Sequence, residues 1–225
     1  MGYTDYSGPG DDIVQSVKAR LRVDLAAPRV TKLVTAYFDP AGPFAGRSFD
    51  TIGSNPANEV TCDDLLAVSL LDVSWDPRAV RRLLCEQAAT VTGFLARIGP
   101  DTALWDAATE ELRAADELWP VLCGLPGVQD AVASKLVARK RPHLAPITDS
   151  VIVTAVGTPG STWPTLRRCF QDPEFRDGIE ELRQQCPGAR DASLLRVFDV
   201  AIWMRYSNST AARKARDSAD SRTST

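Results

Sequence analysis

Helical periodicity recurs along most of this sequence, and it restricts the chain to a fold made of helices. Apolar residues return every three or four positions in one segment after another, as they do over residues 30–37. Several segments also begin with residues that start helices, such as the Asp76-Pro77 pair, which supplies a cap and a first-turn proline. No segment alternates apolar and polar residues over the length of a strand. We therefore predict an all-α fold of roughly ten helices, with short turns between packed neighbours.

Length and charge limit the number of domains and the kinds of partner that the chain can have. The chain has 225 residues, 44% of them hydrophobic, which suits one compact domain or two small lobes with a sizeable core. The formal net charge is −3, whereas a protein that coats DNA regardless of its sequence is normally basic. Any contact with nucleic acid must therefore use a local basic patch. The stretch MGYTDYSGPGDD has neither the basic start nor the apolar run of a signal peptide, and no apolar run reaches membrane-spanning length, so we expect a soluble, cytoplasmic protein with no membrane partner.

The cysteines and the single histidine argue against several kinds of metal site and active site. No cysteine lies within one helical turn of another, so the spacing of a zinc or iron–sulfur site is missing. Their odd number, five, argues against a complete disulfide framework and favours a reducing compartment. His143 alone argues against a Ser-His-Asp site and against a metal site of several histidines. We expect no metal and no cofactor.

Composition divides the chain into three parts. Residues 1–10 are predicted to be a flexible lead-in, and residues 11–206 a single two-lobed helical domain. Residues 207–225 are polar and contain no large apolar residue, so we predict a disordered tail. Within the domain, Asp63 and Asp64 follow Thr61, a candidate N-cap. Adjacent residues on a helix point in different directions, so we interpret these acids as helix N-terminal charge.

The main functional candidate is the stretch LPGVQDAVASKLVARKRPHLAPITDSVI, residues 125–152. Pro126-Gly127 lies between two segments of apolar periodicity and predicts a tight turn, in which Gly127 permits a positive φ. The next helix is expected to start near Gln129 or Asp130. Its unpaired N–H groups and its dipole would point back at the turn, an arrangement that suits an anion such as phosphate.

Two interpretations of this stretch remain open. In one, the turn grips a phosphate, Lys135 and Arg139 share one helix face, and Asp149 is a catalytic carboxylate. In the other, Leu-Pro-Gly is a simple helix corner, the basic residues favour the helix dipole, and Asp149 caps the next helix.

The same stretch resembles the helix-hairpin-helix segment of the DNA glycosylase superfamily that includes endonuclease III. That superfamily has a Leu-Pro-Gly-Val-Gly hairpin, a helix, and an Asp at the end of the following loop. The spacing from Leu125 to Asp149 matches this pattern without a gap. The resemblance implies a two-lobed all-α fold with a helix-hairpin-helix at about residues 114–140. Other segments, including YFDP, PFAG and DDLLAVSLLDV, are similar to an uncharacterised actinobacterial family of unknown function.

The resemblance also implies roles for individual residues. The implied nucleic-acid contacts are Pro126, Gly127, Val128, Gln129, Lys135 and Arg139. An extruded nucleotide would enter a cleft between two lobes, and Asp149 would stabilise the positive charge that develops as the base leaves, or orient the attacking water. Two positions depart from the pattern. Gln129 replaces the second hairpin glycine and crowds the approach of a phosphate. Ala131 replaces the Schiff-base lysine of the lyase members, so lyase chemistry is not expected.

We therefore expect a monofunctional N-glycosylase-like protein that acts on nucleic acid, with duplex DNA as its partner and Asp149 as the catalytic residue. Two alternatives remain. One is a non-catalytic helix-hairpin-helix binding module, which the acidic composition and Gln129 favour. The other is an enzyme that acts on a small nucleoside-like substrate and needs no grip on DNA.

Overall fold

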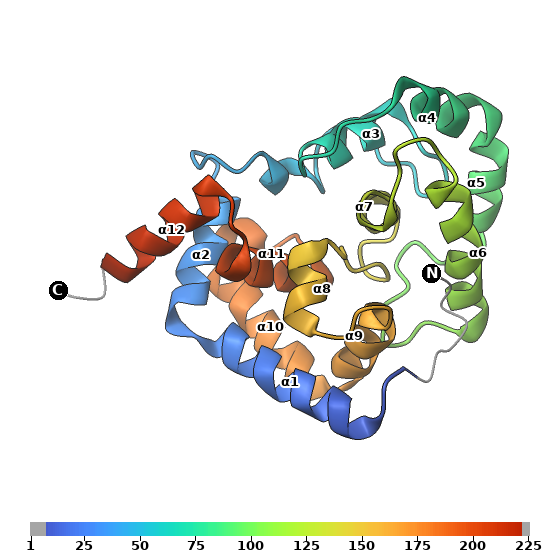
Figure 1. Ribbon diagram of the computed structural model, residues 1–225. Coiled ribbons are helices and arrows are strands. Elements are labelled where there is room, and N and C mark those ends of the chain that lie inside the picture. The colour runs from blue at the N-terminus through green and yellow to red at the C-terminus, as the bar shows by residue number, and fades with distance from the viewer. Residues whose placement is uncertain (1–7, 222–225) are drawn as a thin grey trace. The chain divides into compact units, whose positions relative to one another are not determined.

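The computed structural model describes residues 8–221. Within these residues every regular element is helical, with twelve α-helices, two short 3₁₀ turns and one π-helical turn (Figure 1). The prediction of an all-α fold is therefore confirmed. The chain divides into two compact units. Unit 1 is built on Ser48–Asp149, and unit 2 is built on Pro9–Arg47 and the chain from Ser150 onwards.

Unit 1 contains the middle helices of the chain. They are α3 (Cys62–Ser69), α4 (Pro77–Arg81), α5 (Ala88–Leu95), α6 (Thr109–Cys123) and α7 (Asp130–Lys140). Their starts follow from local sequence. At α3, the Thr61 N–H donates to Asp64 Oδ2 at 2.9 Å in a capping box. At α4, the Arg78 N–H donates to the carboxylate of Asp76 at 2.8 Å. The expectation that Asp64 belongs to a helix start is confirmed.

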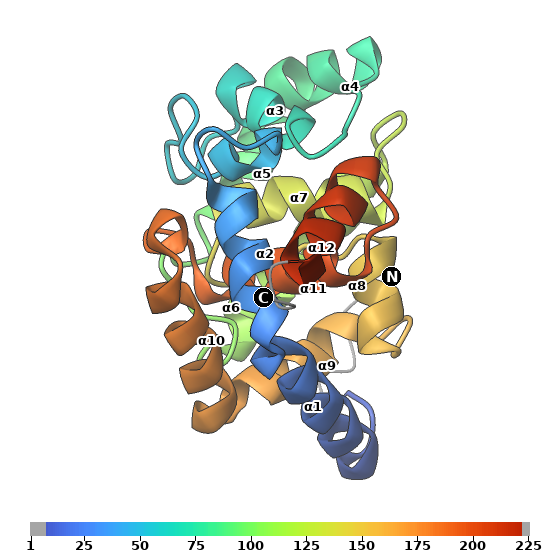
Figure 2. The same cartoon turned by 90° about the vertical axis from the view of Figure 1, so that its left-hand side faces the viewer.

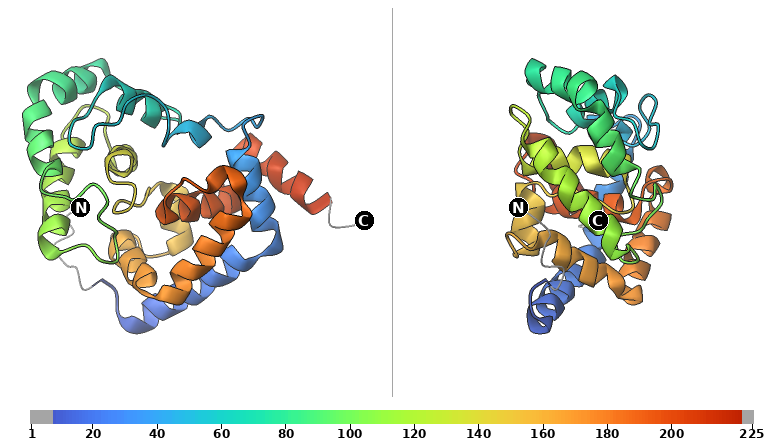
Figure 3. Two further views of the ribbon diagram at one scale, coloured as in Figure 1. Left: turned by 180° about the vertical axis from the view of Figure 1, so that it is seen from behind. Right: turned by 90° about the vertical axis from the view of Figure 1, so that its right-hand side faces the viewer.

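The core of unit 1 forms where α3 packs on α7 and where α6 packs on both α5 and α7. Figure 3 shows α6 beside α5 from behind. The core side chains include Leu65, Val68, Leu95, Leu118, Leu122, Leu136 and Val137, all at most 6% exposed. Burial of each large aliphatic side chain stabilises the fold by about 1.5–3 kcal/mol. The apolar faces of these helices therefore hold unit 1 together.

Unit 2 combines helices from both ends of the sequence. They are α1 (Asp11–Ala26), α2 (Pro28–Phe38), α8 (Ser150–Val156), α9 (Thr162–Gln171), α10 (Pro173–Gln185), α11 (Leu194–Tyr206) and α12 (Thr210–Ser221). The central helix is α11, which packs against α2, α8, α10 and α12 (Figure 2). Phe198 of α11 meets Phe170 edge to face, with ring centroids 5.7 Å apart. Within residues 8–221, no helix combines the length and apolar character that a bilayer span requires.

The prediction of a disordered tail at 207–225 is wrong over most of that segment, because α12 occupies it. Ala212 and Ala219 are buried, and Arg216 donates from Nη1 to Met204 O at 2.7 Å and from Nη2 to Ser207 O at 2.8 Å. The prediction relied on the lack of large apolar residues. Alanine, however, is the strongest helix former, and its small side chain permits close packing. Residues 222–225, and residues 1–7 of the predicted lead-in, lie outside the described residues.

Candidate functional site

The turn predicted at Pro126-Gly127 joins α6 to α7. Gly127 has a φ of +77°, as its position in the turn suggested. The Val128 N–H donates to Leu125 O at 3.1 Å, and both of these side chains are buried in unit 1. Gln129 has an extended backbone and stands at the N-cap, so α7 starts at Asp130. The predicted start of the helix is therefore confirmed.

The N-terminal end of α7 carries unpaired backbone donors. The N–H groups that make no hydrogen bond within the described residues are those of Gly127, Gln129, Asp130 and Ala131. The first bond of the helix comes later, where the Val132 N–H donates to Gln129 O at 2.9 Å. Both Gly127 and Gln129 are exposed to solvent. Free N–H groups at the positive end of a helix dipole are the usual backbone elements of an anion site.

One carboxylate lies on α7 at this end. Asp130 accepts hydrogen bonds from Trp119 Nε1 at 2.8 Å and from Cys123 Sγ at 3.6 Å. Burial, followed by the negative charge of Asp130, raises the pKa of the Cys123 thiol to about 11. The thiol is therefore protonated at neutral pH. Asp130 ties α6 to α7, and its charge opposes the approach of an anion.

A second carboxylate lies close to the turn. A Cβ atom added at Gly127 would stand 3.7 Å from Asp76 Cβ. Asp76 accepts from Arg78 Nε at 3.1 Å and from Nη2 at 2.7 Å, and hydrogen bonds from Arg78 lower the pKa of Asp76 to about 2. The Arg78 side chain is 77% exposed. The surface beside the turn therefore carries both signs of charge at neutral pH.

The two basic residues predicted to contact nucleic acid are engaged within unit 1. Lys135 is half-buried, and its Nζ donates to Leu71 O at 2.8 Å. The Arg139 side chain is 1% exposed. Its Nη1 donates to Phe49 O and its Nη2 donates to Ile52 O, each at 2.6 Å. A guanidinium buried in this way does not reach a phosphate in solvent, so Arg139 is excluded as a nucleic-acid contact.

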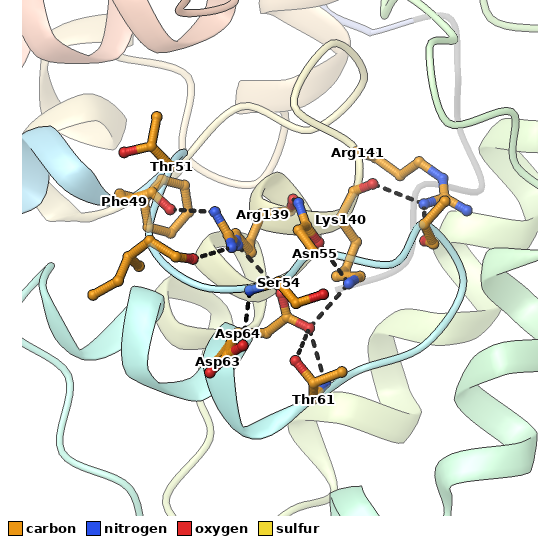
Figure 4. A network of polar contacts seen from close by, with 12 residues as sticks. Phe49, Thr51, Ser54, Asn55, Thr61, Asp63, Asp64, Arg139, Lys140 and Arg141 are labelled. Atoms are coloured by element: carbon orange, nitrogen blue, oxygen red, sulfur yellow. Dashed lines mark hydrogen bonds and ion pairs between the residues drawn. The ribbon is translucent and has the colours of Figure 1, made fainter.

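Arg139 belongs to a buried ion-pair network (Figure 4). The Asp64 side chain, which is 0% exposed, pairs through Oδ1 with Arg139 Nε at 3.2 Å and through Oδ2 with Lys140 Nζ at 2.9 Å. Asn55 joins the same network, because its Oδ1 accepts from Lys140 Nζ at 2.6 Å and its Nδ2 donates to Arg139 O at 2.9 Å. One carboxylate and one amide thus connect the start of α3, the preceding loop and the end of α7.

The neighbouring cations are buried as well. Burial lowers the pKa of Lys140, and the hydrogen bond and charge of Asp64 oppose that shift. Arg141 donates to Leu95 O at 2.5 Å and to Ile98 O at 3.1 Å, at the C-terminal end of α5, where a cation is favourable. Its other acceptors are Lys140 O, Ala57 O and Asn58 Oδ1. The basic residues at the C-terminal end of α7 therefore make internal contacts of unit 1.

Sequence reasoning did not identify this network, although the sequence holds a signal for it. Arg139, Lys140 and Arg141 are consecutive. Successive residues on a helix are about 100° apart, so three in a row cannot all face solvent on a helix that is packed into a core. A basic residue that faces the core needs an acid to pair with it, and an acidic chain supplies candidates such as Asp64.

Asp149 lies at the end of the loop that follows α7, directly before Ser150, the first residue of α8. Its side chain is half-buried. The loop before it is fixed, because the Thr148 N–H donates to Ser134 Oγ at 3.1 Å and Ile147 is buried. Asp149 is the last residue of unit 1 and occupies the position of a helix cap. Within residues 8–221, no group of three or more His, Cys, Asp or Glu side chains is placed to hold a metal ion.

Residues 30–206 match a protein family described as "Family of unknown function (DUF6308)". The match covers well over half of the sequence, and the chain belongs to this family. No curated protein and no solved structure shows significant similarity to the chain. These comparisons do not identify the chain as a helix-hairpin-helix glycosylase, and the resemblance to that superfamily rests on the sequence of residues 125–152 alone.

Proposed function

We propose that this protein binds nucleic acid through the turn between α6 and α7, and that Asp149 assists the release of a base, in the manner of a helix-hairpin-helix N-glycosylase without lyase activity. The observation that carries the proposal is the turn itself. Gly127, at a φ of +77°, leads directly to the start of α7, where four backbone N–H groups have no acceptor among residues 8–221. A backbone phosphate would accept from these N–H groups and gain from the helix dipole.

The proposed chemistry is electrostatic. When the bond between the sugar and the base breaks, the base leaves with the electron pair and the sugar becomes positive. An ionised Asp149 would stabilise that charge or orient the water whose oxygen bonds to the sugar carbon. Half-burial strengthens the effect, because the charges interact through a lower effective dielectric than in bulk water. Ala131 has no amine, so no imine to the sugar forms at that position.

A second candidate is a binding module without catalysis. One observation favours it: Asp149 stands where a helix cap stands. Asp76 and Asp130 place negative charge beside the turn, which opposes DNA binding by either candidate. A third candidate is an enzyme that acts on a small nucleoside-like substrate. The same acids would matter less to that substrate, because it carries few phosphates or none.

Base release from a panel of damaged duplexes separates these candidates. Asn caps a helix about as well as Asp does, so Asp149→Asn removes the charge while keeping the cap. We expect release by the wild type and a loss of about 10²–10³-fold in Asp149→Asn. The matched control is Asp172→Asn, which changes another Asp that directly precedes a helix, and it should release the base at the wild-type rate.

The other outcomes discriminate as well. Salt-dependent DNA binding without release from any substrate would support the binding module and reject the enzyme. Release from free nucleosides alone would support the small-substrate enzyme. Neither release nor salt-dependent binding would overturn the proposal as a whole.

A further inference from the structure

Unit 2 contains a hollow between α2 and α12. These helices pack against each other and lie side by side in Figures 1 and 2. The loop that follows α2 contributes the remaining wall through Asp39, Gly42, Pro43 and Phe44. The cavity volume is about 820 Å³. This volume falls within the range of small-molecule sites, about 300–1,000 Å³.

Small side chains leave this space open. Ala211, Ala215 and Ala219 recur every four residues on α12 and line the hollow, with Ala36 of α2 also in its wall. Leucine at such positions would fill the gap between two packed helices. Alanine instead leaves an apolar recess while the helices remain in contact.

The aromatic part of the wall is held in place by residues that do not line the hollow. Phe44 stacks on Tyr37, with ring centroids 5.2 Å apart and an angle of 26° between the planes. The buried Arg196 donates from Nη2 to Tyr37 Oη at 2.8 Å and to Gly46 O at 2.9 Å. A ligand that contacts Phe44 therefore does not have to order this wall, which favours affinity.

Three of the four hydroxyl groups of the lining, all except that of Thr210, are already used by the protein. Thr31 Oγ1 donates to Gln185 Oε1 at 3.1 Å, and Thr35 Oγ1 donates to Cys186 Sγ at 3.4 Å. The hydroxyl of Ser218 donates to a main-chain oxygen of α12 at 2.9 Å. Specific recognition of a neutral polar ligand by these groups is therefore disfavoured.

The charges of the lining favour an anion. Lys214 is exposed, and its ammonium group makes no hydrogen bond or ion pair within the described residues. Lys32 is a second cation of the lining, and its Nζ donates to Ala219 O at 3.3 Å. The one acid of the lining, Asp39, already accepts from the Ala41 N–H at 2.9 Å. Two cations thus face an apolar recess that has one hydrogen-bonded carboxylate.

We propose that the hollow between α2 and α12 binds an amphipathic organic anion, with its apolar body against the alanines and Phe44 and its carboxylate at Lys214 and Lys32. An ammonium–carboxylate hydrogen bond is among the stronger polar contacts in water, and the apolar body adds the burial of its surface. The helix α12 lies after residue 206, the last residue of the family match. All residues that line the hollow belong to unit 2, so the site shares no residue with the turn in unit 1.

Fluorescence of 8-anilinonaphthalene-1-sulfonate, an aromatic anion, tests this site in the full chain. We expect enhanced fluorescence that decanoate displaces, with decanol at least tenfold weaker. Lys214→Met should weaken decanoate binding about three- to tenfold, which corresponds to at most about 1.4 kcal/mol. Arg213→Met is the matched control, because it removes an exposed charge from the neighbouring residue of α12 that does not line the hollow. It should bind decanoate as the wild type does.

Filling the hollow gives a second test. Ala215→Trp should abolish binding of the probe, and the smaller Ala215→Leu should weaken it while circular dichroism shows retained helix. Unchanged binding in both variants would overturn the proposal, as would a wild type that does not bind the probe. Equal displacement by decanol and decanoate would also overturn it, because the anion would then contribute nothing.

Discussion

The two ends of α7 use charge in opposite ways. At the N-terminal end, backbone N–H groups have no acceptor in the described part of the chain, and two carboxylates, Asp130 and Asp76, lie nearby. At the C-terminal end, Arg139, Lys140 and Arg141 are buried against Asp64 and carbonyl oxygens. The basic residues that suggested a nucleic-acid surface are therefore structural. The functional hypothesis now depends on the backbone of the turn and on Asp149.

The largest expected effect is at the buried end. Asp64→Asn leaves Arg139 and Lys140 without their carboxylate, and loss of one partner in a buried ion pair costs about 3–5 kcal/mol. Urea denaturation would measure this fall in the free energy of unfolding. Asp63→Asn is the matched control, because Asp63 is only half-buried and accepts one hydrogen bond, from the Ser54 N–H. Equal losses in the two variants would contradict the role given to Asp64.

The next largest effect is a difference in stability between variants of two basic residues of α7. Arg139→Met removes one of the two cations that pair with Asp64, and it removes the donor to the carbonyls of Phe49 and Ile52, so we expect a loss of about 3 kcal/mol. Lys135→Met removes the hydrogen bond from a half-buried amine to Leu71 O, and a typical hydrogen bond is worth about 1 kcal/mol. Chemical denaturation of both variants would rank them. A larger loss in Lys135→Met would show that the buried network is not the main stabiliser of this end.

Lys140 should make stability depend on pH. Burial lowers its pKa in the folded protein below the ordinary value of 10.5. Between the two pKa values the unfolded chain binds more protons, so the contribution of Lys140 to stability rises with pH. Below the lowered pKa, the unfavourable contribution is fully present and constant. The free energy of unfolding of the wild type minus that of Lys140→Met should therefore rise as the pH approaches 10.5. A difference that falls with pH would mean that folding raises the pKa of Lys140 and does not lower it.

The helices and the turn could be predicted because they depend on local sequence. The Pro126-Gly127 turn, the start of α7 at Asp130 and the cap at Asp64 all follow from residues within one turn of each other. The pairing of Asp64 with Arg139 joins positions 75 residues apart, and no local rule specifies it. The helix α12 was missed for another reason. The prediction treated a lack of large apolar residues as a lack of packing, whereas Ala212 packs fully.

The smallest expected effect is at the exposed N-terminal end of α7, on the pKa of the Cys123 thiol. Asp130→Asn keeps an acceptor for Trp119 Nε1 but removes the negative charge beside Cys123. The pKa of the Cys123 thiol should fall below its value of about 11, while burial, the larger cause, keeps it above the ordinary 9.0. The rate of alkylation against pH would report the shift, with Cys123→Ser as the blank. An unchanged profile would mean that the charge of Asp130 does not reach the thiol.

The central claim is that the turn before α7 holds a nucleic-acid phosphate, and the salt dependence of DNA binding tests it most directly. We expect Gly127→Ala to weaken binding and to reduce the slope of log K against log salt by about 0.9, the share of one phosphate. The matched control is Gly157→Ala, since Gly157 has a similar φ of +73° and lies in unit 2. Both variants carry a similar backbone strain, about 1–2 kcal/mol, but the control should keep the wild-type slope. A wild type without salt-dependent binding, or a Gly127→Ala variant with the wild-type slope, would contradict the claim.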